Sequence, residues 1–554
     1  MYFSAKPFLM KHITIFSVLV LALLSCSQKE QVDLIITNGN IYTVDGAFSK
    51  AEAFAVKDGK FVATGSSQEI TATYDAAQTI DAVGQTILPG LIDGHCHFYG
   101  LGQNLQVVDL VGTNSYDEVL ERVAAFAQAN PSKTFIRGRG WDQNDWEVKE
   151  FPTKERLDKL FPNIPVALER VDGHAYLVNQ KALDMANITT ATQVSGGEIV
   201  KVNGKITGVL VDKPQEMIDA VMPQANRQQN INALMGAQEV CFSYGLTTVN
   251  DAGLDKEIIE MIDSLQTAGD LQMRVYAMIS NKAKNLDHYL NTGKVKTDYL
   301  NVRSVKVYGD GALGSRGAAL REAYSDKHGH FGAMITPADE MNALAKRIVK
   351  AGYQMNTHAI GDSANVVALR AYKDALKTTD DPRWKIEHAQ VVSAQDFDYF
   401  GDKILPSVQP THATSDMYWA EDRVGAHRIK GAYAYKDLLK KSGRVILGTD
   451  FPVESVNPFY TFYAAVARKD LKQYPEGGYQ MENALSRKET LQGMTIWAAY
   501  SNFEENEKGS IEPGKFADFV ILPKDIMTMP EDDIPNMYVN DTYVAGKRVY
   551  TIPK

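Results

Sequence analysis

Cysteines are few in this sequence and basic residues are not in excess, and each shortage excludes a class of protein. Three cysteines among 554 residues are too few for a disulfide framework. The 58 Lys and Arg are outnumbered by 68 Asp and Glu, giving a net charge of −10. This balance argues against a nucleic-acid partner, because binding to phosphates needs clustered positive charge.

The composition is otherwise that of an ordinary globular protein, with 44% hydrophobic and 23% charged residues. Disordered, collagen-like and polytopic membrane proteins are thereby excluded. At roughly 100–200 residues per domain, the chain is too long for one small domain, but a large α/β barrel with attached units would fit.

The N-terminus is typical of an export signal. Lys6 and Lys11 precede an apolar run, Ile13 to Leu24, that is too short to span a bilayer comfortably. We therefore predict a signal peptide over residues 1–25. The run ends in Leu-Leu-Ser-Cys26, which resembles a bacterial lipobox and predicts an exported lipoprotein held at a membrane surface by acyl chains on Cys26. The alternative is a signal peptide followed by an incidental Cys26.

The two ends of the mature chain are rich in short strands. Residues 26–87 contain apolar runs separated by turn signals such as Asn38-Gly39, and residues 507–554 repeat this style. We expect both ends to form one small β-sandwich.

Residues 88–506 alternate strand-like and helical stretches, which predicts βαβ units and a parallel α/β barrel. A segment rich in Pro, Gly and charge at about 141–224 interrupts the alternation and is expected to be an insertion near the barrel mouth. Active sites of such barrels lie at the carboxyl ends of the strands. The strand candidates with polar ends include 134–140, 246–251, 305–310, 353–358, 384–388 and 444–450.

Histidines and carboxylates at these ends predict a metal site. His95 and His97 lie on the same side of an extended chain and can chelate one ion. Later strands end in or near Lys306, His358, His388 and Asp450. Imidazole and carboxylate suit Zn²⁺ and neighbouring transition metals. A water bound there would have its pKa lowered towards ~7 and yield hydroxide, with Asp450 accepting the proton and passing it to a leaving group.

Several runs resemble the metal-dependent amidohydrolase superfamily, and more narrowly the amidohydrolase 3 (YtcJ-like) family. The resemblance extends from about Asp33 to Tyr550 and implies a distorted TIM (β/α)8 barrel that hydrolyses C–N bonds other than peptide bonds. It rests on Leu88–His97, Val171–His174, Asp310–Arg316, His358–Asp362, Gly448–Val453 and Gly509–Asp518.

The resemblance also implies metal ligands. In family members with two metals, a lysine at the position of Lys306 is carboxylated by CO₂ and bridges the ions. A desolvated lysine has a lowered pKa and can capture CO₂ as the free amine. In the alternative, Lys306 stays an ammonium paired with Asp310 beside a single Zn²⁺, so one or two ions remain open. The implied ligands are His95, His97, His358 and His388, with Asp450 as ligand and base.

Three further residues are predicted to contact substrate. The resemblance places His174 near the mouth, where it would polarise the scissile carbonyl or bind a substrate carboxylate; a structural histidine is the alternative. Arg316 would clamp an anion or pair with Asp310. His412 follows the 404–410 run and is a further candidate contact.

Taken together, these features predict an exported, lipid-anchored, metal-dependent hydrolase acting on a small amide-type substrate, with no nucleic-acid partner. Two alternatives stay open. The same hydroxide could attack a lactone or other ester, or the barrel could be a small-molecule-binding surface lipoprotein without catalysis. Substrate identity is not predicted, because specificity lies in the loops and fold does not fix function.

Overall fold

The computed structural model describes residues 1–3, 29–131, 133–194 and 197–553. Apart from its first three residues, the predicted signal peptide lies outside the described residues, and so does Cys26. Among the helices of the described part, none has the length and apolarity needed to cross a membrane.

The predicted barrel is confirmed. Eight parallel strands follow one another around it in chain order. Past the last strand, the backbone N–H of Asp450 donates to the carbonyl of His95 (2.8 Å), and the N–H of His97 to that of Phe451 (2.7 Å), which joins the last strand to the first. The strands are β8 (Leu91–Cys96), β15 (Leu246–Leu254), β16 (Arg274–Ser280), β18 (Leu300–Tyr308), β19 (Gln354–Ala359), β20 (Trp384–His388), β21 (Ile404–Val408) and β22 (Ile446–Leu447).

Helices cover the outside of the barrel, so its strands are buried on both faces, as parallel strands require. In α9 the buried residues Ile258, Ile259, Ile262 and Leu265 recur at helical spacing, which gives the helix one apolar face. Gly269 then ends the helix in a left-handed conformation with φ 82°. The helices after the barrel strands include α9 (Lys256–Ala268), α10 (Ala283–Thr292), α11 (Ala338–Lys350), α12 (Asp362–Ala375), α15 (Tyr435–Ser442), α16 (Pro458–Ala467), α17 (Arg487–Gly493) and α18 (Ile496–Ser501).

The two chain ends form the predicted β-rich unit. One sheet combines both ends in the order β25-β24-β23-β7-β2-β3, whereas the other, β5-β4-β1-β6, is entirely N-terminal. Phe54, Phe61 and Phe519 pack edge to face between them, with ring centroids 5.1 and 4.9 Å apart. The strands are β1 (Glu30–Thr37), β2 (Asn40–Tyr42), β3 (Lys50–Ala51), β4 (Ala53–Lys57), β5 (Lys60–Gly65), β6 (Tyr74–Asp81), β7 (Thr86–Pro89), β23 (Phe519–Leu522), β24 (Asp541–Val544) and β25 (Lys547–Thr551).

The insertion begins earlier in the chain than residue 141. It is a separate six-stranded sheet, β13-β14-β12-β11-β10-β9, and it takes in the 134–140 strand that we expected in the barrel. That strand pairs in parallel with its neighbours β9 and β11, so its local pattern is the βαβ pattern of a barrel. The elements are β9 (Val108–Asp109), α4 (Tyr116–Ala129), β10 (Ile136–Trp141), α5 (Glu155–Leu160), β11 (Val166–Arg170), β12 (Ala175–Val178), α6 (Gln180–Met185), β13 (Gly197–Val202), β14 (Lys205–Asp212) and α7 (Gln215–Asp219).

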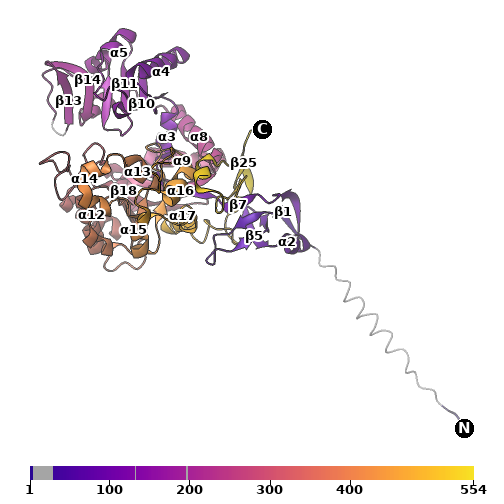
Figure 1. Ribbon diagram of the computed structural model, residues 1–554. Coiled ribbons are helices and arrows are strands. Elements are labelled where there is room, and N and C mark those ends of the chain that lie inside the picture. The colour runs from indigo at the N-terminus through magenta and orange to yellow at the C-terminus, as the bar shows by residue number, and fades with distance from the viewer. Residues whose placement is uncertain (4–28, 132, 195–196, 554) are drawn as a thin grey trace.

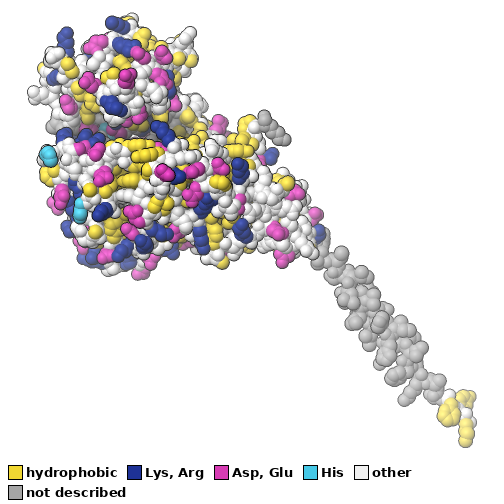
Figure 2. Space-filling view, in the orientation of Figure 1, with side chains coloured by type: hydrophobic (Ala, Val, Ile, Leu, Met, Phe, Trp, Pro, Cys, Tyr) yellow, Lys and Arg dark blue, Asp and Glu magenta, His cyan; other side chains and the backbone are white. Residues whose placement is uncertain are grey.

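The insertion forms its own lobe beside the barrel (Figure 1), and the two lobes are separated by a groove in the space-filling view (Figure 2). In the chain it lies between α3 (Phe98–Asn104) and α8 (Arg227–Ser243), two helices that pack against each other. Since α3 directly follows His97 at the end of β8, the insertion is attached at the carboxyl end of the barrel strands.

Candidate metal centre

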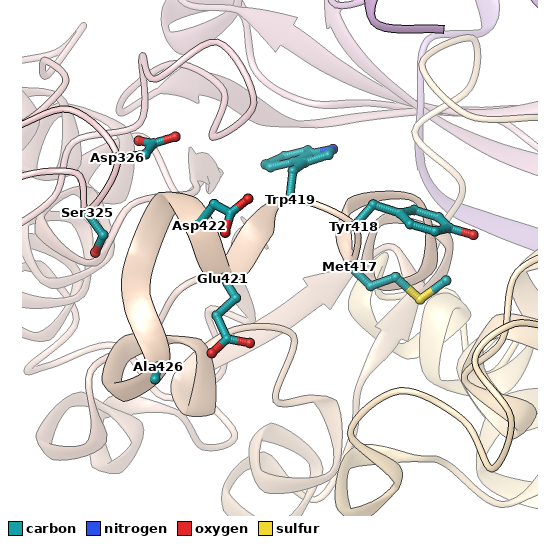
Figure 3. Close-up of a pocket in the computed structure, with 8 residues that line it drawn as sticks. All are labelled: Ser325, Asp326, Met417, Tyr418, Trp419, Glu421, Asp422 and Ala426. Carbon is teal, nitrogen blue, oxygen red and sulfur yellow. The ribbon is translucent and has the colours of Figure 1, made fainter.

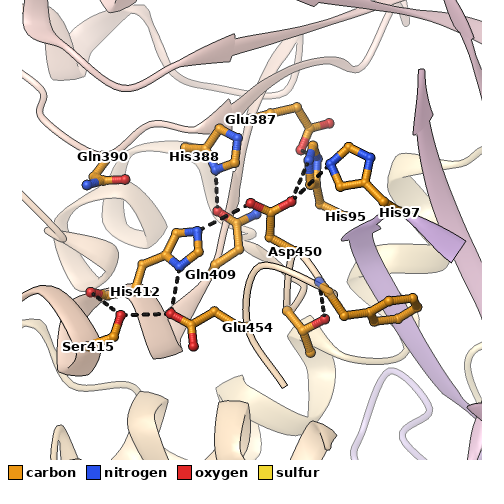
Figure 4. A network of polar contacts seen from close by, with 12 residues as sticks. His95, His97, Glu387, His388, Gln390, Gln409, His412, Ser415, Asp450 and Glu454 are labelled. Atoms are coloured by element: carbon orange, nitrogen blue, oxygen red, sulfur yellow. Dashed lines mark hydrogen bonds and ion pairs between the residues drawn. The ribbon is translucent and has the colours of Figure 1, made fainter. Parts of the chain in front are cut away.

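Histidines and one aspartate meet at the carboxyl ends of the barrel strands (Figure 4). The possible ligand atoms of His95, His97 and Asp450 lie within 4.8 Å of one another, and so do those of His388, His412 and Asp450. Asp450 Oδ1 is 3.3 Å from His97 Nε2 and 3.5 Å from His95 Nε2. Asp450 therefore belongs to both groups.

Two of these residues have an unusual backbone conformation. His388 and Asp450 have φ values of 72° and 61°, in the left-handed region that few residues other than glycine adopt. Side chains alternate along a strand, so in a regular strand the side chains of Glu387 and His388 would point to opposite faces. The turn at His388 brings its ring to 5.0 Å from that of His95, which Glu387 also contacts. Strain of this kind is typical of functional sites.

The orientation of His95 is fixed from inside the barrel. Its Nδ1 lies 2.7 Å from the carboxylate of Glu387, and its Nε2 lies 3.0 Å from Nζ of Lys306. Burial alone would raise the pKa of Glu387, but Lys385 and His95 lower it to about 2, so the ionised carboxylate accepts a hydrogen bond from Nδ1–H. Burial and Lys306 lower the pKa of His95 to about 4. The imidazole is thus neutral and carries its proton on Nδ1, and its Nε2 can act as a ligand once Lys306 no longer donates to it.

The second group is held by different partners. His388 Nδ1 lies 2.8 Å from Gln409 Oε1, which leaves its Nε2 available. His412, in α13 (Pro410–Asp416), lies between Asp450 (Nε2 to Oδ2, 3.5 Å) and Glu454 (Nδ1 to Oε1, 3.1 Å). Burial opposes the charged imidazolium, but the two carboxylates raise the pKa of His412 to about 10. We expected a substrate contact from His412; the structure places it beside the predicted base.

Lys306 does not pair with Asp310. The Asp310 carboxylate instead accepts hydrogen bonds at 2.8–3.0 Å from three backbone N–H groups, those of Ala319, Ile360 and Gly361. Lys306 is buried against His95, and burial lowers its pKa to about 8. The alternative of an ammonium paired with Asp310 therefore loses its partner.

His358 belongs to neither of the two groups, although its ring centroid is 4.5 Å from that of His388. Burial and Lys306 lower the pKa of His358 to about 3, so this imidazole is neutral.

The side chains present fit a divalent cation. Within the described part of the chain, Asp450 Oδ1 and His358 Nε2 are buried and have no hydrogen-bond partner. Buried polar atoms are normally hydrogen-bonded, so an unpartnered buried atom on each of these two residues fits a ligand role. Neutral imidazoles and a carboxylate are the donor set preferred by Zn²⁺ and related ions.

The other two predicted substrate contacts are already engaged in ion pairs. His174 lies on the turn between β11 and β12, with Nδ1 2.9 Å from Asp212 Oδ1, and this hydrogen bond raises its pKa. Arg316 forms a two-point pair with Asp326, with distances of 3.1 and 2.8 Å. It is therefore paired, but with Asp326 and not with Asp310.

A cavity of about 640 Å³ opens beside α14 (Ala420–Arg428), as Figure 3 shows. Part of its lining, Met417 to Trp419, directly follows α13, which carries His412 near its start. The lining combines aromatic and acidic side chains: Ser325, Asp326, Met417, Tyr418, Trp419, Glu421, Asp422 and Ala426.

Sequence reasoning missed Glu387, Glu454 and Asp93. Glu387 immediately precedes His388. A carboxylate next to a candidate ligand histidine could have been predicted to orient a ligand, and this was the signal available in the sequence. Asp93, two residues before His95, accepts hydrogen bonds from His95 N (3.1 Å) and Thr449 Oγ1 (2.7 Å), and burial raises its pKa to about 7. Glu454 contacts His412 only through the fold, and no local pattern indicates it.

Comparison with known proteins shows the family to which the chain belongs. The model of the amidohydrolase family matches residues 78–550. YtcJ of Bacillus subtilis (strain 168) is 30% identical over 523 residues, covering 92% of this chain and 98% of that protein. The N-substituted formamide deformylase of Arthrobacter pascens is 26% identical over 542 residues, covering 93% and 97%. The crystal structure of an uncharacterized metal-dependent hydrolase from Pyrococcus horikoshii OT3 superposes with a TM-score of 0.75 at 27% identity, covering 90% and 99%.

Proposed function

The chain belongs to the amidohydrolase family and is a hydrolase, and we propose that it cleaves a non-peptide amide bond of a small molecule with Asp450 as the proton shuttle. The observation that carries the proposal is the position of Asp450. Its carboxylate is buried at the barrel mouth and is shared by both groups of possible ligands.

The proposed division of labour follows from the contacts. His95, His97, His358, His388 and Asp450 would hold a divalent metal, with zinc as the first choice. When bound there, such a metal lowers the pKa of water to about 7 and polarises a carbonyl oxygen. Asp450 accepts the proton of the attacking water and delivers it to the leaving nitrogen. Burial raises the pKa of its carboxyl, but the neighbouring imidazoles of His412 and His97 lower it well below the ordinary value, so Asp450 is ionised and ready to accept.

Lys306 is proposed to be carboxylated by CO₂. Its amine would add to the carbon of CO₂ and release one proton, giving a carbamate that supplies a bridging negative charge. Support comes from the burial of Lys306 and from the position of its Nζ, 3.0 Å from His95 Nε2. The Asp310 carboxylate is bound to backbone N–H groups and does not pair with Lys306. Elemental analysis before and after adding Zn²⁺ and bicarbonate tests this: two ions per chain support the bridge, and one ion opposes it.

Substrate hydrolysis is tested with protein from residue 27 onward, loaded with Zn²⁺. The panel contains N-substituted formamides, N-acetyl amino acids, cyclic amides and lactones, with the formamides first because of the named Arthrobacter relative. The proposal is supported if the protein hydrolyses an amide, if a chelator abolishes this activity, and if added Zn²⁺ restores it. Turnover of lactones alone would make the enzyme an esterase, and tight binding of an amide without turnover would make the barrel a binding protein.

We also propose that the chain is exported and held at a membrane surface through Cys26. The support is the sequence alone, namely the basic residues, the short apolar run and the Leu-Leu-Ser-Cys motif. Labelled palmitate should enter the wild-type protein but not Cys26→Ala, and equal labelling of both would contradict the anchor.

A further inference from the structure

We propose that Arg139 is a positioning residue that holds two parts of the substrate cleft in one fixed arrangement. One part is the His174 turn of the insertion, residues 171–174, and the other is the Asp450 loop of the barrel, residues 450–453. The inference rests on the proposed function, because it assumes that substrate lies between these two segments.

The guanidinium of Arg139 contacts both segments at once. Its Nη1 donates to the carbonyl oxygen of Pro452 at 3.1 Å, and its Nη2 donates to that of Val171 at 2.9 Å. The side chain is only 13% exposed. Arg139 belongs to β10 in the insertion, whereas Pro452 follows the barrel strand β22, so the contact crosses the groove between the lobes.

The Asp450 loop is rigid on its barrel side. The backbone N–H of Asp450 donates to the carbonyl of His95 at 2.8 Å, and that of Val453 donates back to Asp450 at 2.9 Å. A hydrogen bond to Pro452 therefore reaches a segment already fixed to the first metal-ligand strand.

The His174 turn is equally well fixed on the insertion side. The N–H of His174 donates to Asp172 Oδ1 at 3.0 Å, and its ring is bound to Asp212. The N–H of Val171 donates to the carbonyl of Trp141, the residue two positions after Arg139. The His174 turn and the Asp450 loop are thus each held by hydrogen bonds within their own lobe, and the Arg139 guanidinium donates to both segments.

Arginine suits this task better than lysine. Its planar guanidinium presents donors in a rigid fork and contacts two carbonyl oxygens simultaneously, whereas an ammonium is a compact point donor on a flexible stem. Glu169 faces Arg139 in register on the neighbouring strand, with Oε2 3.6 Å from Nε, and partly balances the charge.

The consequence concerns the geometry of attack. The proposal takes His174 as a substrate contact through its Nε2, since only Nδ1 is bound to Asp212. Such a substrate must present its carbonyl to groups arranged around Asp450, and a misplacement of about 1 Å can cost on the order of 10²-fold in rate. Without Arg139 the two segments move independently. The expected loss is therefore about 10–100-fold in kcat/KM, mainly in kcat, with metal content unchanged.

The first test needs no substrate. Hydrogen–deuterium exchange is compared for the zinc-loaded wild type, Arg139→Ala, Arg139→Lys and Arg122→Ala. Arg122 is a matched control, since it donates to the carbonyls of Asp109 and Val111 at 3.2 and 3.0 Å entirely within the insertion. In Arg139→Ala we expect faster exchange in peptides that cover residues 171–174 and in peptides that cover residues 450–453. The increase should be smaller in Arg139→Lys, and neither segment should change in Arg122→Ala. Unchanged exchange at either segment in Arg139→Ala would overturn the proposal.

The second test asks whether Arg139 acts through His174. On an amide from the panel, the Arg139→Ala/His174→Ala double variant should have the same kcat/KM as His174→Ala alone. Once the His174 side chain is removed, Arg139 no longer positions a substrate contact, so its loss has no further effect. Multiplicative losses would overturn the proposal. If the wild type hydrolyses no amide, the proposed function fails, while the exchange experiment still decides whether Arg139 couples the lobes.

Discussion

Glu387 on β20 and His95 on β8 are joined by a 2.7 Å hydrogen bond across the barrel interior, although β21 and β22 separate their strands in the sheet. Both side chains are completely buried, and Lys385 Nζ lies 3.3 Å from the other oxygen of the carboxylate. A carboxylate behind a ligand histidine fixes its tautomer and raises its basicity, so Glu387 would position His95 in the proposed metal site without touching substrate.

Glu387→Gln is therefore expected to weaken Zn²⁺ binding about 10–100-fold. The amide has nearly the same shape, but it lacks the negative charge that favours the Nδ1–H tautomer of His95. Competition titration with a chromogenic chelator measures the affinity. Glu504→Gln is the control, because it also changes a buried glutamate, but one that pairs with Lys296 and Lys508. Equal zinc affinity in Glu387→Gln and wild type would remove Glu387 from the site.

Asp450→Asn should retain most of the metal and lose about 10²–10⁴-fold in kcat, the usual contribution of a positioned acid or base. The amide oxygen is still a possible ligand, but it cannot accept and return a proton at neutral pH. Metal content by elemental analysis and kcat on the best amide substrate are measured on the same preparation. An active variant would exclude Asp450 as the base.

The titration of His174 should depend on Asp212. The hydrogen bond to Asp212 raises the pKa of His174 above its ordinary value near 6.5, although burial opposes the shift. Any stability gained from this pair is fully present below that ordinary value and is lost as the pH rises through the raised pKa. NMR titration of histidine-labelled protein, with His174→Asn for assignment, should show a lower midpoint in Asp212→Asn. A midpoint that does not move would show that Asp212 does not hold the proton on His174.

Arg274 and Asp518 should be a major link between the barrel and the β-rich unit. Their side chains are 0% and 4% exposed and are joined at 2.6 and 2.9 Å. Asp518→Ala leaves a buried guanidinium uncompensated and is expected to cost about 3–5 kcal/mol of the free energy of unfolding. Urea denaturation measures the loss. The exposed pair of Lys57 and Glu30 is the control, since Lys57→Ala should leave the free energy of unfolding nearly unchanged. Similar losses in the two variants would contradict the assigned role.

Most of the barrel could be predicted from the sequence because its signal is local. Runs such as 384–388 are short, buried along their whole length and end in a polar residue, so their position within a parallel sheet is encoded within a few residues. The 134–140 strand carries the same local signal but belongs to the insertion. Local patterns cannot assign a parallel strand to one of two sheets, because the choice depends on distant partners.

The sequence by itself determined which residue types stand at the strand ends. The His95-x-His97 spacing and the terminal positions of His358, His388 and Asp450 follow from strand periodicity. Only the tertiary structure decided the partners: Glu387 with His95, Glu454 with His412, Asp326 with Arg316, and backbone N–H groups with Asp310. The physical reason is that hydrogen bonds and ion pairs depend on separations of a few ångströms between residues far apart in the chain. Those separations are set by barrel closure and by left-handed turns at His388 and Asp450, neither of which leaves a periodic trace in the sequence.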